Sequence, residues 1–267
     1  MNNLIMAFLL TLFAGLSTGI GSTLAFFTRK TNTRFLAVSL GFSAGVMIYV
    51  SMIEIFFKAK DSLIGELGIK MGSWVTVFSF FAGMILIAII DKIIPSYENP
   101  HELRKIEDID ENKNNPGINL LRMGTFTALA IAIHNFPEGL ATFTAALKEP
   151  TIAIPIGVAI AIHNIPEGIA VSVPVYFATG NRKKAFIYSF LSGLSEPLGA
   201  LIGYLILMPF ISDLTFGILF AAVAGIMVFI SIDELLPSAQ KYGEHHLSIY
   251  GLMVGMAVMA VSLLLFI

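Results

Sequence analysis

The amino-acid sequence predicts an all-α, polytopic membrane protein with eight transmembrane helices in one domain. Two numbers indicate this class: 56% of the 267 residues are hydrophobic and only 13% are charged. That balance excludes a soluble globular domain and a disordered chain. The third observation is a series of apolar segments, each at or above the roughly 20 residues that cross a bilayer. Cysteine is absent, so the chain has no disulfide framework and no thiolate metal site.

The predicted spans follow one another along the whole of residues 1–267. The first has no basic residue before it and is long, so we interpret it as a retained span and not a cleaved signal peptide. We therefore expect a multi-pass protein of the cell (inner) membrane. The eight segments are 4–26, 35–57, 71–91, 121–147, 151–178, 184–208, 213–236 and 247–267.

One stretch, residues 92–120, is predicted to lie outside the membrane. Its main part, 96–120, is polar and rich in acidic residues, and it has no apolar periodicity. We interpret it as a cytoplasmic loop between spans 1–3 and spans 4–8. His101 lies in this loop near acidic residues, where a solvated linker and a weak metal-sampling role are both open. The same two interpretations apply to His245 and His246.

The distribution of basic residues predicts the orientation. Of the 16 Lys and Arg residues, 12 lie in or beside loops 1, 3, 5 and 7, and four lie in loops 2, 4 and 6. Cytoplasmic loops carry the excess of positive charge in membrane proteins. We therefore expect the odd-numbered loops in the cytoplasm and both termini outside.

A polar hexapeptide occurs twice inside the oily sequence. The copies are HNFPEG at 134–139 and HNIPEG at 163–168, and Ala-Ile-Ala-Ile precedes each. Both histidines lie about 12 or 13 residues into their spans, which places them near the bilayer centre. The loop between the spans is short, so the spans are antiparallel neighbours. Placing ionisable groups at that depth costs free energy, so a functional role is the default hypothesis for them.

The spacing within each motif places the polar side chains together. His134 and Glu138 are four residues apart, and Asn135 and Glu138 are three apart, so all three share one helix face. His163, Asn164 and Glu167 repeat the pattern. Imidazole, carboxylate and amide oxygen suit a borderline divalent cation such as Zn²⁺, Fe²⁺ or Mn²⁺.

Prolines accompany the polar groups. Pro137 and Pro166 lack an N–H group, so each removes a helical hydrogen bond and we expect a kink at each. The freed carbonyls can take ligands or water, as in the broken helices of transporters. Span 6 has the same device in Glu196 and Pro197, again about 12 residues in. We expect Glu196 to add a third mid-membrane carboxylate.

Other features have two interpretations each. Met47 in span 2 is a candidate soft ligand, or a packing residue. The acidic residues near span ends are a cation entrance and exit, or wetted helix ends. Small residues four apart allow close helix packing, and they permit a homodimer without requiring one. The acidic residues are Glu54, Asp91, Asp233 and Glu234, and the small pairs are Gly15/Gly19, Gly41/Gly45, Gly199/Gly203 and Gly251/Gly255.

The doubled motif resembles that of the ZIP family of metal transporters. The segment AVSVPVYFATG at 170–180 follows the second copy, as in that family. LGFSAGVM at 40–47, SGLSEPLGA at 192–200 and AGIMVFISIDELLP at 224–237 match the family pattern in spans 2, 6 and 7. The resemblance covers nearly the whole chain except the loop.

The resemblance implies eight spans, outward termini and uptake of Zn²⁺ and other divalent cations through a binuclear site between spans 4, 5 and 6. It also implies that spans 1–3 and 6–8 are inverted repeats. By position, the first site is His134, Glu138, His163 and Glu167, with Met47 as a further ligand. The second site is Asn135, Glu138, Asn164, Glu167 and Glu196. Many relatives have a His-rich loop, whereas the loop here has one histidine.

Two other classes stay open at this stage, a membrane di-metal enzyme and a proton or sodium pathway. Against an enzyme, the chain has no HExxH motif, nucleophile pair or cofactor motif, so we expect no catalytic cofactor. It has no Walker loop for ATP-driven pumping. The net charge of −2 gives no sign of a nucleic-acid partner. The expected partners are the bilayer and divalent ions, with Zn²⁺ ahead of Fe²⁺, Mn²⁺, Co²⁺ and Cd²⁺.

Overall fold

The described chain is helical, as the sequence predicts. The computed structural model describes residues 3–27, 33–93, 132, 135–147, 150–207, 212–242 and 245–264, and within these residues it has no β-strand. The helical segments are α1 (Asn3–Phe27), α2 (Thr33–Tyr49), η1 (Val50–Ile55), α3 (Phe56–Ile93), residues 135–147, α5 (Pro150–Thr179), α6 (Arg182–Gly193), α7 (Ser195–Leu207), α8 (Asp213–Ile230), η4 (Ser231–Leu235), α9 (Leu236–Tyr242) and α10 (His245–Leu264).

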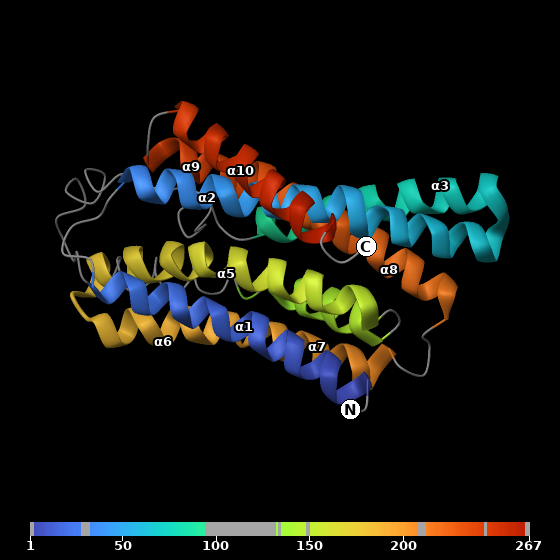
Figure 1. The fold of residues 1–267 in the computed structure, drawn as a ribbon, viewed down its shortest axis with the longest axis horizontal. Helices are drawn as coiled ribbons and strands as arrows, with labels where there is room; N and C mark the ends of the chain where they lie inside the picture. Colours follow the sequence, from blue (N-terminus) through green and yellow to red (C-terminus); the bar gives the residue numbers. More distant parts are fainter. Residues whose placement is uncertain are drawn as a thin grey trace.

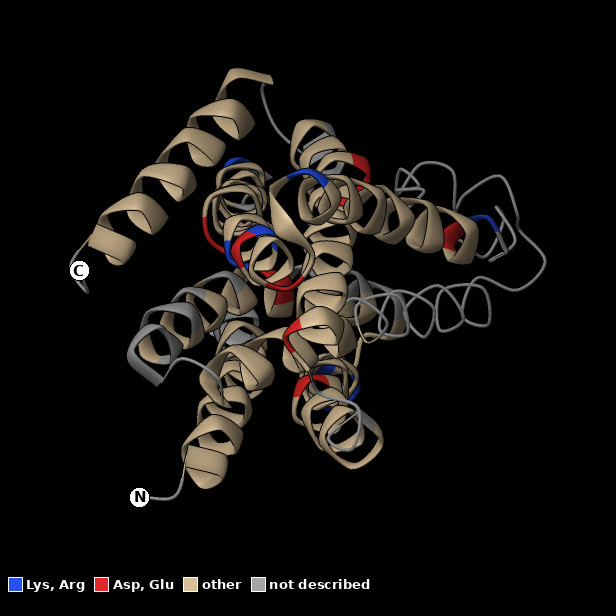
Figure 2. Cartoon of the chain, turned by 90° about the vertical axis from the view of Figure 1, so that its right-hand side faces the viewer, with Lys and Arg blue, Asp and Glu red and all other residues tan. Residues whose placement is uncertain are grey.

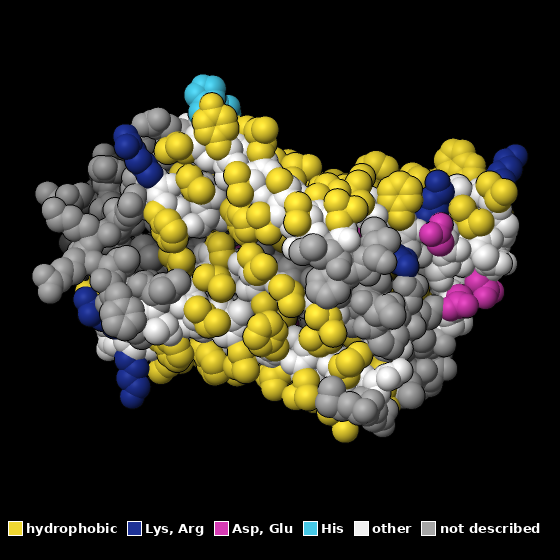
Figure 3. Space-filling view, viewed as in Figure 1, with side chains coloured by type: hydrophobic (Ala, Val, Ile, Leu, Met, Phe, Trp, Pro, Cys, Tyr) yellow, Lys and Arg dark blue, Asp and Glu magenta, His cyan; other side chains and the backbone are white. Residues whose placement is uncertain are grey.

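The surface matches a protein that crosses a bilayer several times. In the described chain, five helical stretches are long and apolar enough to span a membrane. Figure 3 shows hydrophobic side chains covering the middle of the molecule and Lys and Arg toward its two ends. The stretches are Asn3–Thr23, Ala37–Lys92, Arg182–Ile206, Asp213–Leu235 and His245–Leu264. The exact number of eight spans stays a prediction, and the 96–120 loop lies outside the described residues.

The predicted loop between spans 2 and 3, residues 58–70, is mostly helix. The helical backbone continues through η1 into the first half of α3 and is interrupted only at Gly68, where φ is +76°. Glycine adopts this conformation without a Cβ penalty. Beyond it the chain doubles back, since a Cβ at Gly72 would collide with the carbonyl oxygen of Leu63. The prediction of a loop at residues 58–70 was wrong, because the charged residues of an exposed helix resemble those of a loop in the sequence.

The prolines of spans 5 and 6 have different effects on their helices, and one further boundary differs from the prediction. Span 6 consists of two helices separated by Leu194, which confirms the distortion expected near Pro197. In contrast, α5 stays helical across Pro166, so this proline does not end the helix. The chain also remains helical past residue 236, through α9 to Tyr242.

The helices form two groups, which Figure 1 shows one above the other. The group that we call the motif block contains α1, residues 135–147, α5, α6 and α7. The second group, the flanking block, contains α2, η1, α3, α8, η4, α9 and α10. Figure 2 looks along the long axis and shows most helices close to end-on, with uncharged residues making up most of the ribbon.

Small residues bring helices into close contact within each block. A Cβ at Gly41 or Gly45 in α2 would collide with the backbone of α10, and Gly251 and Gly255 meet α2 in the same way. In the motif block, Gly15 of α1 lies against the backbone of α6. The small-residue pairs therefore act in packing inside one chain.

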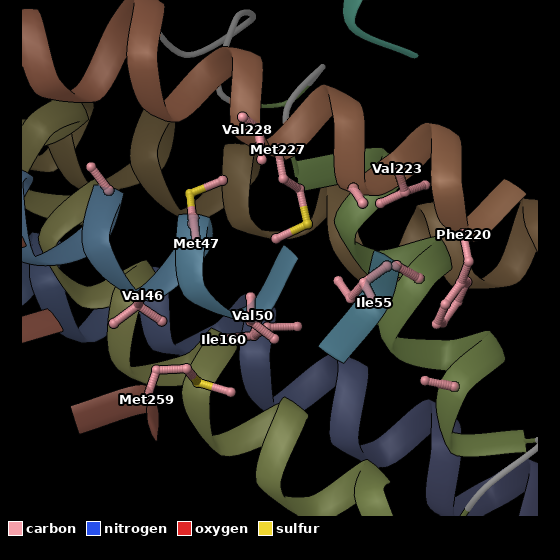
Figure 4. Close-up of a cluster of buried hydrophobic side chains, with 14 of the residues drawn as sticks. Val46, Met47, Val50, Ile55, Ile160, Phe220, Val223, Met227, Val228 and Met259 are labelled. Carbon is pink, nitrogen blue, oxygen red and sulfur yellow. The ribbon is translucent and has the colours of Figure 1, made fainter. Parts of the chain in front are cut away.

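An apolar cluster lies between the blocks. Ala14, Ala141 and Ile160 of the motif block share this buried cluster with Met47 and other residues of the flanking block. Figure 4 shows part of it, with Met47 of α2 and Met227 of α8 in the same cluster. The blocks therefore meet largely through aliphatic and thioether side chains.

The flanking block contains a local sequence repeat between spans 2 and 7, in line with the inverted repeats that the family resemblance implies. Residues 43–56 read SAGVMIYVSMIEIF, and residues 223–236 read VAGIMVFISIDELL. The two segments end α2 and α8, and both become π-helical at the equivalent point, in η1 and η4. A π-turn inserts one residue in a helix and is often found at functional sites.

Candidate metal centre

Glycine residues bring the backbones of the motif helices into direct contact around the candidate site. Gly139, next to Glu138, lies so close to α7 that a Cβ there would collide with the carbonyl oxygen of Glu196. Gly199 of α7 meets the carbonyl oxygen of Phe136 in return. Because glycine permits this approach, the first motif and Glu196 are held against each other.

The second motif is held against α1 by the same device. A Cβ at Gly168, next to Glu167, would collide with the carbonyl oxygen of Thr18. A Cβ at Gly21 would collide with the carbonyl oxygen of Ile165. Helix α1 is therefore a structural wall of the motif region, although no motif residue comes from it.

Asn164 connects three helices through its side-chain amide. Its Nδ2 donates to the carbonyl oxygen of Ala14 in α1 at 2.8 Å and also to Oε1 of Glu196 in α7. The side chain is fully buried. Both donor hydrogens are used, and Oδ1 has no hydrogen-bond partner among the described residues.

Asn135 is oriented in a similar way. Its Nδ2 donates to the carbonyl oxygen of Ser192 in α6 over 3.4 Å, and its Oδ1 has no hydrogen-bond partner in the described chain. Oε2 of Glu196 also lacks one there. Three buried acceptor oxygens, from residues 135–147, α5 and α7, thus remain for a donor or a cation. Buried polar groups are normally satisfied, so such a group requires an explanation.

Three carboxylates complete the described part of the site. Glu138, Glu167 and Glu196 are each at most 1% exposed. Gly139, next to Glu138, lies against the backbone of Glu196, and Asn164, one helical turn before Glu167, donates to the Glu196 carboxylate, so the three carboxylates come from adjoining segments. Buried like charges are strongly unfavourable unless a cation or proton compensates them. The arrangement is therefore suited to binding positive charge.

The described residues do not by themselves form a complete cage. No three described His, Asp or Glu side chains have the geometry of a single metal site. His134 lies outside the described residues, and His163 is placed in α5 without a described side chain. The candidate site therefore rests on the chemistry of the amide and carboxylate oxygens and on their convergence.

The other candidate residues lie elsewhere. Met47 is fully buried in the apolar cluster between the blocks (Figure 4). Glu54 lies in η1, and Asp233 and Glu234 lie in η4, in the flanking block. Asp91 is near the end of α3. None of these four carboxylates belongs to the motif block.

Comparison with known proteins identifies the same family that the doubled motif resembles. The family model described as ZIP zinc transporter matches residues 91–263, more than half of the chain. The zinc transporter ZupT of Clostridium perfringens is 66% identical over 279 residues, which cover 100% of this chain and 98% of that protein. The chain belongs to the ZIP family.

Other ZIP relatives align over nearly their full length. The zinc transporters ZupT of Oceanobacillus iheyensis and Streptococcus mutans are 64% and 65% identical, each over 99% of both chains. Family membership, together with the apolar helices, makes this a multi-pass membrane protein of the ZIP type.

Sequence reasoning missed the contribution of α1 to the site. The carbonyl of Ala14 holds Asn164, and the carbonyl of Ser192 faces Asn135. Carbonyl groups carry no side-chain signal, so no motif could identify them. The only sequence signal was the density of small and hydroxyl residues in α1, such as Gly15, Ser17 and Thr18.

Proposed function

We propose that this protein mediates uptake of divalent transition-metal cations, above all Zn²⁺, into the cytoplasm. The observation that carries the proposal is the convergence of buried carboxylate and amide oxygens from three helices, in a chain of the ZIP family. Full-length relatives that are named zinc transporters support the choice of metal. Fe²⁺, Mn²⁺, Co²⁺ and Cd²⁺ are further substrates of the same proposal.

The proposed centre is binuclear and lies between spans 4, 5 and 6. The first site is formed by His134, Glu138, His163 and Glu167, with Met47 as an additional soft ligand. The second is formed by Asn135, Asn164 and Glu196, together with the two shared carboxylates. Glu138 and Glu167 lie between the His and Asn positions on their helices, so each can serve both sites.

These residues would act by replacing the hydration shell of the ion. Two imidazoles in the first site favour borderline metals over Mg²⁺, which prefers oxygen and retains water. In the second site, Asn164 keeps Glu196 in place while its own Oδ1 faces the ion. Protein oxygens compensate the ion for lost water inside the membrane, where an uncompensated charge is very costly.

The deciding experiment is uptake of radioactive zinc by proteoliposomes that contain the purified protein. We expect saturable uptake that the other divalent metals inhibit and Mg²⁺ does not. The variants Glu138→Ala and Glu167→Ala should each reduce uptake at least tenfold while the protein remains folded, because each removes a charged ligand from both sites. Circular dichroism and gel filtration establish the fold.

A matched control is Glu66→Ala, which removes an exposed carboxylate in α3, two residues before the turn at Gly68. It should transport zinc at the wild-type rate. Near-normal uptake by Glu138→Ala or Glu167→Ala would rule out the proposed site. Proton or sodium flux without metal binding, or turnover of a bound substrate, would replace metal uptake with one of the two alternative classes.

A further inference from the structure

Helix α1 contributes one buried hydroxyl group that has no hydrogen-bond partner. The Oγ1 atom of Thr18 is fully buried and unbonded among the described residues. Besides Ser51 in η1, no other described hydroxyl group is in this state. In the candidate metal centre, Oδ1 of Asn135, Oδ1 of Asn164 and Oε2 of Glu196 are in the same state among the described residues. Thr18 therefore shares the unusual property of the site residues.

The other hydroxyl groups of α1 are satisfied within the helix. Thr11 donates to the carbonyl of Ala7 at 3.0 Å, and Ser22 donates to that of Thr18 at 3.0 Å. Thr23 also donates to the carbonyl four residues earlier, and Ser17 donates to the carbonyl three residues earlier. Such back-bonding is the usual arrangement for Ser and Thr in helices. Thr18 is the exception within the described range of α1.

The site itself explains the exception. The carbonyl four residues before Thr18 belongs to Ala14, and besides the helical hydrogen bond from a backbone N–H it already accepts two from side chains. One comes from Ser17 Oγ at 2.6 Å, and the other comes from Asn164 Nδ2 at 2.8 Å. A carbonyl oxygen has two lone pairs, and these donors already occupy both, so no acceptor position remains there for the hydroxyl of Thr18. Fixing Asn164 in the site leaves the hydroxyl of Thr18 without its normal partner.

The position of Thr18 places this hydroxyl at the edge of the site. The carbonyl of Thr18 lies against Gly168, the residue after Glu167. On the other side, a Cβ built on Gly193 would lie 2.9 Å from Thr18 Oγ1. Gly193 precedes Glu196 by three residues and ends α6 at the interruption of span 6. The hydroxyl therefore lies where α1 meets α6, one helical turn after the Ala14 carbonyl that holds Asn164.

We propose that Thr18 is a fourth-helix residue of the second metal site. Its hydroxyl oxygen binds the cation there, either directly or through one water molecule that it orients. A hydroxyl oxygen is a hard ligand that suits Mn²⁺ and Zn²⁺, and a bridging water is nearly as good as a direct bond. This inference rests on the proposed function, and it adds a ligand from a helix that carries no motif.

The test compares Thr18→Val, which removes only the hydroxyl and keeps the branched shape, with Thr18→Ser, which keeps the hydroxyl. Titration calorimetry with ZnCl₂ and MnCl₂ on purified protein measures the affinity of each site. We expect Thr18→Val to weaken the weaker metal by about 5- to 30-fold, the effect of one polar contact. Mn²⁺ should be affected more than Zn²⁺, while the tighter metal is unchanged. Thr18→Ser should restore the wild-type value.

Stability without metal separates a ligand from a packing residue. Exchanging an unbonded buried hydroxyl for a methyl group should leave the metal-free melting temperature unchanged or raise it. Thr11→Val is the control, because Thr11 is equally buried in α1 but bonded to Ala7. It should lower the melting temperature and leave both metal affinities intact. If Thr18→Val fails to fold, Thr18→Ala provides the same comparison without the branched side chain.

Wild-type affinity for both metals in a folded Thr18→Val or Thr18→Ala variant overturns the inference, as does loss of the tighter metal alone. Failure of the proposed function has a different signature, since the wild-type protein would then bind no transition metal.

Discussion

At the residue scale, the proposed function depends on ionisable groups buried in a membrane protein, where an uncompensated charge is strongly unfavourable. The carboxylates of Glu138, Glu167 and Glu196 are buried inside a membrane protein. Hydrocarbon cannot solvate them, and packing alone gains nothing from them. Asn164 shows how the chain orders such groups, since one amide holds a backbone carbonyl and a carboxylate at once. This ordering of buried acidic groups is what the proposed cation site requires.

One prediction at this scale separates the two sites. Glu196→Gln removes a ligand charge from the second site only, so one tightly bound metal per chain should remain, with altered flux. Replacing both histidines, His134→Ala with His163→Ala, should remove the tight metal and spare a weak one, because imidazoles select borderline metals. Metal stoichiometry by calorimetry or anomalous diffraction measures both. Loss of the tight metal in Glu196→Gln, with retention in the double variant, would show that the assignment is wrong.

A second prediction concerns pH. Metal ligands must be deprotonated, so protons compete with the cation. An imidazole has an ordinary pKa of about 6.5, and protonation below that value removes it as a ligand. Affinity of the purified protein for Zn²⁺ should therefore fall as pH falls from 7.5 to 5. Constant affinity over that range would contradict ligation by His134 and His163.

At the element scale, glycine determines how the motif helices meet. The first motif approaches α7 through Gly139, and the second approaches α1 through Gly168. The motif Pro-Glu-Gly thus contains a proposed ligand and, next to it, the glycine contact that fixes the helix carrying that residue. This explains why the glycine belongs to the hexapeptide although it has no side chain to bind metal.

The prediction for this scale is that Gly139→Ala destabilises the protein and disturbs the second site. The new Cβ would collide with the backbone of Glu196, and overpacking of this kind costs about 1–3 kcal/mol. Thermal unfolding and metal titration should both show the loss. Gly65→Ala in α3 is the control, since a Cβ there meets nothing within 4 Å. It should stabilise the helix by up to about 1 kcal/mol. Equal stability of the two variants would contradict the close contact.

At the scale of the whole molecule, the two blocks have different tasks. The motif block holds the candidate ligands, and the flanking block presents the repeated α2 and α8 segments with their π-turns. The start of α1 and the end of α10 lie toward the same end of the long axis in Figure 1. The structure does not determine which side of the membrane these ends face. The excess of Lys and Arg in the odd-numbered loops predicts that both face outward.

The absence of cysteine allows a direct test of this orientation. Glu66→Cys and Lys183→Cys place single thiols at exposed positions in predicted loops 2 and 5. A membrane-impermeant maleimide should label the Glu66→Cys variant in intact cells. The Lys183→Cys variant should be labelled only after the membrane is opened. The reverse pattern would place both termini in the cytoplasm.

The sequence by itself determined the class of the protein and the composition of its candidate site. Hydropathy over about 20 residues is a local quantity, so the apolar spans were predictable within a few residues at most ends. The spacing of His, Asn and Glu within each motif is local as well, because helix geometry alone places them on one face. Pro197, next to Glu196, correctly predicted a distortion of the helix in span 6.

Tertiary structure decided what depends on distant parts of the chain. Residues 58–67 read as a loop but continue as helix, because the hairpin partner in α3 and the turn at Gly68 support them. The carbonyl of Ala14 that holds Asn164 is 150 positions away in the sequence. Because this contact occupies the carbonyl of Ala14, the hydroxyl of Thr18 is left without its usual acceptor. Backbone carbonyls and satisfied lone pairs leave no pattern in a sequence, because their partners are chosen only when the helices pack.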